Sequence, residues 1–324
     1  MTTEKAAAAP PSLLYRLRKV LREGLRAGLK SCLFLLKIAV PVSLAVSLLN
    51  YTGVLALLAG LINPLMTLLG LRGEAALVIV TSILLNNYSA IAVVQTLEFS
   101  GREVTILAVM CLIAHNMLVE TAVMKTIGSS VWKMAILRIG TAIAAAFLLN
   151  LLLPDAIDVN YSAVTVGGRV AFGPYLYSWL VATAGLVLKI VVFVFAIMIL
   201  QRLLEEFRIT YFLSRLFAPL MRLFGLSRES SFLWIVINTI GYAYGAAVIM
   251  DQVKGGAMRP QEADLFNHHA AISHSLLEDS LLWWAIGVPL FWLVIPRVVL
   301  AVVVVWLERL RRHLFKSSFR VGTV

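Results

Sequence analysis

Long apolar runs alternate along this chain with short polar or basic segments. Six stretches have the length of a membrane span and are predicted to cross as helices: 31–49, 104–124, 134–153, 176–200, 267–285 and 290–307. About 20 predominantly apolar residues cross the hydrocarbon core as one α-helix. A helix also satisfies its own backbone hydrogen bonds, as lipid requires. The pattern therefore predicts an all-α, polytopic membrane protein.

The chain carries the same unit twice. Residues 63–74 and 218–229 are identical at seven of twelve positions. Matched landmarks follow in the same order: Lys37 with Lys189, His115 with His274, Glu120 with Asp279, and Arg138 with Arg297. Such self-similarity indicates duplication of one structural unit. We predict two repeats, 31–153 and 176–308, joined by an external linker at 154–175.

Each repeat holds two pieces that are not expected to cross. The stretch 203–224 carries five charged residues, so it is predicted to lie at the interface, as is its counterpart 54–70. The arms 75–85 and 90–97 are each about half a membrane thickness long, which predicts a re-entrant helical hairpin. The second hairpin turns at 241–245. Broken backbone at membrane depth survives where protein or a wet cavity shelters it.

Composition and charge then fix the topology. The chain is 60% hydrophobic and only 14% charged, with a net charge of +11. Of 28 Lys and Arg, 21 fall on the side that holds both termini and 3 on the other, as expected for cytoplasmic termini. Three crossings per repeat invert the second copy. We therefore predict a bacterial-type inner (plasma) membrane protein, without nucleic-acid binding, whose segment 1–30 is a cytoplasmic amphipathic helix and whose segment 309–324 is a basic cytoplasmic tail.

Ionisable residues inside predicted spans are candidates for ion or proton coupling. They are His115, Glu120, His274, Glu278 and Asp279. A divalent metal site is the alternative, with candidate ligands His268, His274, Glu278 and Asp279. On an ideal helix His115 and Glu120 point about 140° apart, so one ion can face both only if that helix is broken. A purely structural hydrogen-bonded network is the other interpretation.

The hairpin tips supply neutral donors and acceptors for a polar solute. The candidate substrate-binding residues are Asn86, Asn87, Ser89, Asn238, Tyr242 and Tyr244. Ordinary turn chemistry explains Asn at such places equally well. Among the intramembrane cations, Arg138 is expected to extend toward the membrane surface, and Arg297 to pair with Glu278 or Asp279.

The order of interfacial helix, hairpin, polar helix and apolar helix resembles the Gate, or nucleoside-recognition, family. That group includes spore-maturation membrane proteins, the membrane domain of ferrous-iron permeases and, distantly, concentrative nucleoside transporters. The stretch 87–124 is most similar to the iron-permease pattern. It lacks that pattern's Gly-Cys-x-Val-Pro tip, and the chain has no phosphate-binding Gly-x-x-x-x-Gly-Lys-Ser/Thr loop.

Together these features predict a secondary transporter that works by alternating access, coupled to protons or cations, for a small polar solute. The alternatives are a divalent metal (iron-like) permease and a non-transporting membrane subunit that serves as a platform for a partner protein in an envelope or spore-type process. The expected partners are the lipid bilayer and the solute or cation, with a homo-oligomer or a membrane partner protein as a further possibility. No nucleophile–base or metal-hydrolase motif is present, so neither enzymatic activity nor a resident cofactor is predicted.

Overall fold

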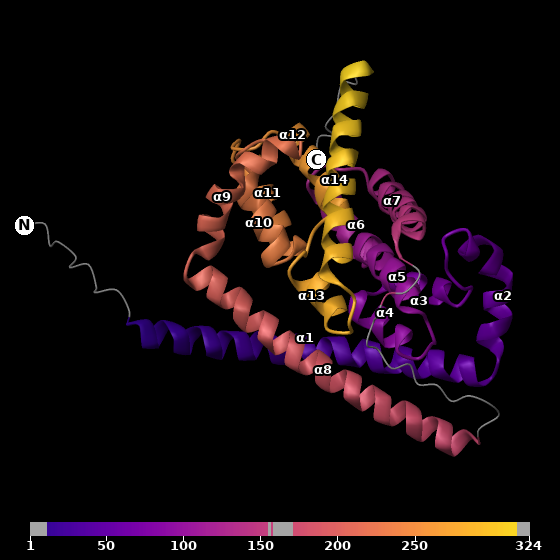
Figure 1. Ribbon diagram of the computed structural model, residues 1–324. Helices are drawn as coiled ribbons and strands as arrows, with labels where there is room; N and C mark the ends of the chain where they lie inside the picture. Colours follow the sequence, from indigo (N-terminus) through magenta and orange to yellow (C-terminus); the bar gives the residue numbers. More distant parts are fainter. Residues whose placement is uncertain (1–11, 155–156, 158–170, 316–324) are drawn as a thin grey trace, which may run out of the picture.

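The computed structural model describes residues 12–154, 157 and 171–315, and all regular structure within them is helical (Figure 1). The helices of the first repeat are α1 (Leu13–Tyr51), α2 (Val54–Thr67), α3 (Ala75–Leu84), α4 (Asn87–Val94), α5 (Gly101–Ala114), α6 (Met117–Thr126) and α7 (Val131–Leu152). Those of the second are α8 (Phe172–Glu206), α9 (Ile209–Leu223), α10 (Ser230–Thr239), α11 (Tyr242–Lys254), α12 (Pro260–Ile272), α13 (Glu278–Trp284) and α14 (Leu290–Leu314). The two series correspond element by element.

Five segments among the described residues are long and apolar enough to cross a membrane: α1, α5 with α6 as Gly101–Thr126, α7, α8 and α14. This confirms a polytopic, all-helical membrane protein. The sixth predicted crossing, 267–285, is divided between α12 and α13 and does not form one long helix. The predicted linker 154–175 and tail 309–324 lie partly outside the described residues.

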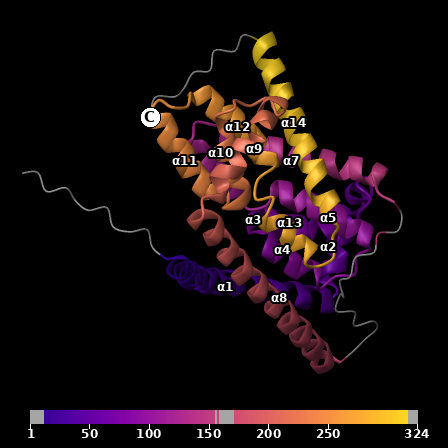
Figure 2. The same cartoon turned by 60° about the vertical axis from the view of Figure 1, so that its left-hand side comes forward.

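The two first helices, α1 and α8, lie together along one side of the molecule in both views (Figures 1 and 2). They are antiparallel, because Arg16 pairs with Glu206 at one end while Ser47 hydrogen-bonds Tyr175 at the other. That is the relative direction that inverted repeats require. Helix α1 continues through residue 30 without a break, so residues 13–30 of the predicted amphipathic segment form one helix with the first span, while residues 1–11 lie outside the described part of the chain.

At each predicted hairpin the chain forms a pair of short helices, α3 with α4 and α10 with α11. In the first, the chain breaks at Leu85 and Asn86, and the Asn86 side chain caps α4 by accepting a hydrogen bond from the Ser89 N–H at 2.9 Å. In the second, the break falls at Gly241, whose φ of +115° favours glycine. Asn87 and Ser89 therefore belong to the first turn of α4 rather than to the turn itself.

The polar helix of each repeat is also broken, which the continuous helix predicted for 104–124 does not anticipate. The first break lies at Asn116, with φ +47°, and the second at Ser275, with φ +50°. Each break is tied to the hairpin of its own repeat. The Asn116 N–H donates to the Ser82 carbonyl, and the Ser275 N–H donates to the Ile237 carbonyl, both at 2.9 Å.

The core contains α4, α5 and α12, whose side chains are buried almost throughout. The spans α1, α7, α8 and α14 surround them and expose large apolar side chains, such as Leu33, Phe147, Leu188 and Val303. In a membrane this exposed apolar shell faces lipid. The polar positions of the broken helices are thereby held in the interior.

Candidate functional site

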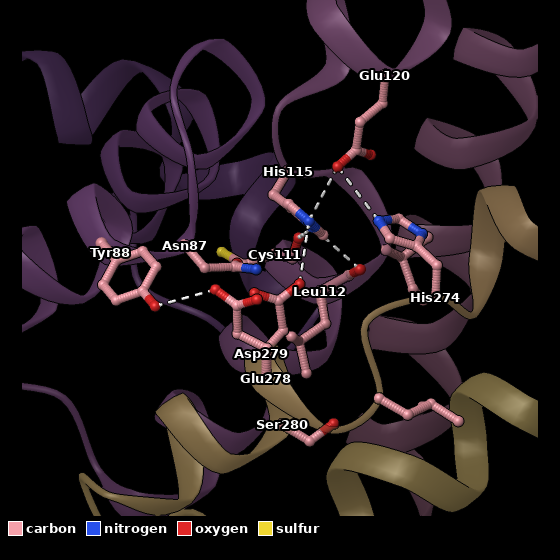
Figure 3. A network of polar contacts seen from close by, with 12 residues as sticks. Asn87, Tyr88, Cys111, Leu112, His115, Glu120, His274, Glu278, Asp279 and Ser280 are labelled. Atoms are coloured by element: carbon pink, nitrogen blue, oxygen red, sulfur yellow. Dashed lines mark hydrogen bonds and ion pairs between the residues drawn. The ribbon is translucent and has the colours of Figure 1, made fainter. Parts of the chain in front are cut away.

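The two broken helices meet at a buried cluster of histidines and carboxylates (Figure 3). His115 Nε2 lies 3.3 Å from Glu120 Oε1 and 3.2 Å from Asp279 Oδ2. The same Glu120 oxygen lies 3.2 Å from His274 Nε2. The break at Asn116 removes the angular conflict of a straight helix, because it lets Glu120 on α6 turn back toward His115. One carboxylate thus contacts a histidine from each repeat.

Hydrogen bonds to the main chain decide how both imidazoles are oriented. His115 Nδ1 lies 3.1 Å from the Cys111 carbonyl, and His274 Nδ1 lies 2.6 Å from the Ala270 carbonyl. A carbonyl only accepts, so Nδ1 carries the hydrogen in each ring. A neutral imidazole of this tautomer presents a bare lone pair at Nε2, facing a carboxylate oxygen. A proton or a cation between Nε2 and the carboxylate oxygen makes the contact between the two groups favourable.

Two fully buried arginines support the breaks. Arg138 donates to the Ile113 and His115 carbonyls at 2.8 and 2.7 Å and forms an ion pair with Glu120 at 2.7 Å. Those carbonyls end α5, where the backbone has no helical partner and the helix dipole is negative. The expectation that Arg138 reaches the membrane surface is therefore wrong: orphan carbonyls and a buried carboxylate hold it inside.

The matched Arg297 repeats part of this arrangement. It donates to the His274 carbonyl at 2.5 Å and lies 3.3 Å from the Ser280 hydroxyl. Its predicted ion pair with Glu278 or Asp279 is not formed within 4.0 Å, because the guanidinium instead supports the end of α12. Each arginine thus donates to the carbonyl of the histidine at the break of its own repeat.

Glu278 connects this cluster to the first hairpin and to α8. The Tyr88 hydroxyl donates to Glu278 Oε1 at 3.2 Å, and the Gln201 amide donates to Oε2 at 3.3 Å. Beside these groups lies a cavity of about 500 Å³, within the range of small-molecule sites. Its polar lining comes from Asn86, Asn87, Tyr88, His115, Asn116, Glu120, Ser275, Glu278 and Asp279.

Comparison with known proteins agrees with this architecture. The sequence profile of the Gate family, described as nucleoside recognition, matches residues 32–130. The chain is also 33% identical over 289 residues to the uncharacterized membrane protein YvoD of Bacillus subtilis (strain 168), an alignment that covers 88% of this chain and 93% of that protein. The chain belongs to the Gate family of membrane proteins. No solved structure matches it.

The Gate fold brings together the five predicted coupling residues and the predicted residues at the tip of the first hairpin. Asn86 and Asn87 line the cavity, and the Asn87 amide nitrogen is buried there without a hydrogen bond. Ser89 is buried and bonded to Asn86. His274 does not line the cavity but contacts it through Glu120.

Other predicted residues of this Gate protein do not line the cavity. Asn238 holds the second break, since its carbonyl accepts from the Leu277 N–H at 3.0 Å. Tyr242 packs against the His274 ring, with centroids 5.6 Å apart. The side chain of Tyr244 lies outside the described residues. The metal candidate His268 belongs to a separate buried group with Asp264 and Glu308.

Sequence reasoning missed several residues of the Gate site. Tyr88 lies inside the tip sequence, where a tyrosine next to two asparagines is a recognisable polar signal. Gln201 gives a weaker signal, because it falls at the predicted end of an apolar helix. Trp283 is fully buried, and its indole N–H donates to the side-chain oxygen Oδ1 of Asn87 at 3.5 Å. Only the three-dimensional fold brings it there.

Proposed function

We propose that this Gate protein is a secondary transporter for a small polar solute, working by alternating access and coupled to protons or cations. The observation that carries the proposal is the pair of imidazole Nε2 atoms facing Glu120 and Asp279, beside a polar cavity. Buried ionisable groups in a membrane protein are costly and typically mark solute, ion or proton pathways.

The chemistry of the cluster supports coupling. With Nδ1–H committed to the backbone, each Nε2 needs a proton or cation to face a carboxylate. Loss of that proton places lone pair against lone pair, so the cluster favours a different arrangement of the two repeats. Glu120 is the shared contact, because it bonds histidines of both repeats. Occupancy of the cluster is thus linked to how the repeats meet.

The cavity lining indicates the kind of solute. Three carboxylates, from Glu120, Glu278 and Asp279, line it together with asparagine and tyrosine groups. Carboxylates accept hydrogen bonds and attract positive charge. The site therefore suits a solute rich in N–H and O–H donors, and nucleosides, for which the family is named, fall in that class. We expect the protein to occupy a bacterial-type inner membrane with both termini in the cytoplasm.

A divalent metal ion as the transported substrate is the second candidate. Ligand atoms of His115, His274 and Asp279 lie within 4.8 Å of one another. In tetrahedral zinc-type sites, ligand atoms are roughly 3.3 Å apart, close to the 3.2 Å between His115 Nε2 and Asp279 Oδ2. Metal-binding histidines commonly donate the other ring N–H to a carbonyl, as both histidines do here.

Transport in proteoliposomes tests the proposal. Purified protein is reconstituted with a pH-sensitive dye inside, and a panel of nucleosides or Mn²⁺ is added outside. We expect solute uptake accompanied by proton movement in the wild type, and loss of both in His274→Ala and Asp279→Asn. Asp251→Asn, on the exposed surface of α11, is the matched control and retains them.

The outcomes separate the candidates. Unchanged uptake in both cluster variants removes the coupling role. Uptake of Mn²⁺ alone, abolished by His274→Ala, favours the metal permease. Absence of flux for every solute, together with a stable complex with another membrane protein, points to a partner platform instead.

A further inference from the structure

A second polar cavity, of about 370 Å³, lies where α9 joins α10, with further walls from α12 and α14. We call it the α9–α14 cavity. It shares no lining residue with the central cavity. Three arginines line it: Arg222 on α9, Arg228 in the turn and Arg309 on α14. Among the described residues, no hydrogen bond or ion pair engages the exposed Arg222 and Arg228 side chains.

Hydrogen bonds between α14 and the turn after α9 fix one side of the cavity. Arg309 donates to the Gly225 carbonyl at 2.7 Å, and the Trp306 indole donates to the Leu223 carbonyl at 2.9 Å. Gly225 has φ +72°, and a Cβ there would lie 3.0 Å from Val305 Cγ1. The turn after α9 is therefore fixed against α14, so the arginines surround a preformed space.

The cavity carries an excess of positive charge. Two acidic residues also line it, Glu229 and Glu262. Glu262 is already paired with Arg259 at 2.6 Å. That leaves three guanidinium groups against one unpaired carboxylate. Guanidinium groups bind phosphate oxygens through paired, charge-assisted hydrogen bonds.

Helix α9 indicates the depth at which this cavity lies. Arg215 and Arg222 lie seven residues apart and so share one face of the helix, and Arg208 stands at its N-cap. Beside them, Phe212 and Leu216 are 68% and 63% exposed. An amphipathic helix of this kind lies at the boundary between headgroups and acyl chains. The cavity at its end is thus at the level of the lipid phosphates.

The first repeat provides an internal comparison. There the equivalent turn also contains a glycine with positive φ, Gly70 at +71°. By the sequence alignment of the repeats, however, the positions of Arg222, Arg228 and Arg309 are taken by the neutral Thr67, Gly73 and Asn150. The first repeat carries other cations in this region, but Arg72 is paired with Glu103 at 3.1 Å and Arg102 donates to the Asn150 side chain at 2.7 Å, so both are already engaged.

We propose that the α9–α14 cavity binds the phosphate headgroup of an anionic phospholipid in the arginine-rich leaflet. Acyl chains of such a lipid would lie along the exposed apolar side chains of α9. This site goes beyond the proposed transport function and does not depend on it. Basic pockets between membrane helices are suited to anionic headgroups.

Native mass spectrometry of the purified full-length protein tests the site. The probes are mixed micelles containing phosphatidylglycerol or phosphatidylcholine, and free glycerol 1-phosphate. We expect wild-type protein to retain phosphatidylglycerol in preference to phosphatidylcholine. In Arg222→Gln/Arg228→Gln that preference falls by about tenfold or more, because two charge-assisted bonds are lost.

Arg215→Gln is the matched control, since it removes a cation from the same face of α9 but outside the cavity, and it keeps the preference. Arg222→Lys/Arg228→Lys retains part of it and shows that the fold is intact. Equal phosphatidylglycerol retention by wild type and the double glutamine variant overturns the proposal. Competition by glycerol 1-phosphate at the same concentration as the lipid also overturns it, because the site would then bind free phosphate esters.

Discussion

Replacing Arg138 by methionine removes the most heavily used cation of the central site. The guanidinium makes three contacts, with the carboxylate of Glu120 at 2.7 Å and with the carbonyls of Ile113 and His115 at 2.8 and 2.7 Å. Its side chain is fully buried. Methionine fills similar space without donors, so the variant isolates the loss of charge and hydrogen bonds.

The magnitude follows from what is left behind. Removing one partner of a buried ion pair typically costs about 3–5 kcal/mol, because the other charge stays buried without compensation. The two orphaned carbonyls add to this, although the contributions of one network do not simply sum. At about 2–4 °C per kcal/mol for large domains, the melting temperature falls by roughly 6 °C or more.

Thermal unfolding followed by tryptophan fluorescence in detergent measures the effect, and a double-mutant cycle assigns it. Glu120→Gln is expected to relieve part of the cost, so Arg138→Met/Glu120→Gln is less destabilised than the sum of the single variants by about 1 kcal/mol or more. Arg297→Met is the matched control, since Arg297 supports the other break without an ion pair to Glu120. Additive behaviour of Arg138→Met with Glu120→Gln would refute the argument.

Three further outcomes are expected. Ser275→Gly keeps or raises the melting temperature, whereas Ser275→Val lowers stability by about 1–2 kcal/mol, because residue 275 has a left-handed backbone with φ +50°. Equal effects of the two substitutions would show that the break does not need this conformation. Gly28→Val lowers the free energy of unfolding by about 1–3 kcal/mol in the same assay, because even the first side-chain carbon would lie 2.7 Å from Phe195 Cδ1. Gly185→Ala is the control and costs nothing, because no atom lies within 4 Å of the added carbon. A tolerated valine at position 28 would mean that α1 and α8 do not pack closely. Asn86→Cys reacts with a small thiol reagent and only slowly with a bulky membrane-impermeant maleimide; fast reaction with the maleimide would place the hairpin tip on a membrane surface and not in an interior cavity.

Much of the fold can be predicted from the duplicated sequence. The hairpin arms, the matched His115 and His274, and the order of elements follow from run lengths and from the comparison of the chain with itself. Apolar periodicity does not predict the breaks at Asn116 and Ser275, because the neighbouring residues include neither proline nor glycine. The breaks are held by tertiary hydrogen bonds to the hairpins, which have no local sequence signal.

The sequence predicts which residues form the candidate site but not how they are arranged. On a straight helix the side chains of His115 and Glu120 point about 140° apart, and only the break brings them together. Arg138 illustrates the same limit. Its position near the start of an apolar run suggests a surface residue, whereas carbonyl groups exposed by a break elsewhere in the chain determine its burial.

The main-chain bonds between Asn116 and Ser82, and between Ser275 and Ile237, have a mechanical consequence. Because one arm of each hairpin is bonded to the interrupted helix of its own half, we expect the two to move as one body. In the proposed transport cycle we expect the two halves to shift against each other at the contact between Glu120 of one half and His274 of the other. Side chains, which can exchange a proton or an ion, join the two bodies there, and among the described residues no main-chain hydrogen bond does.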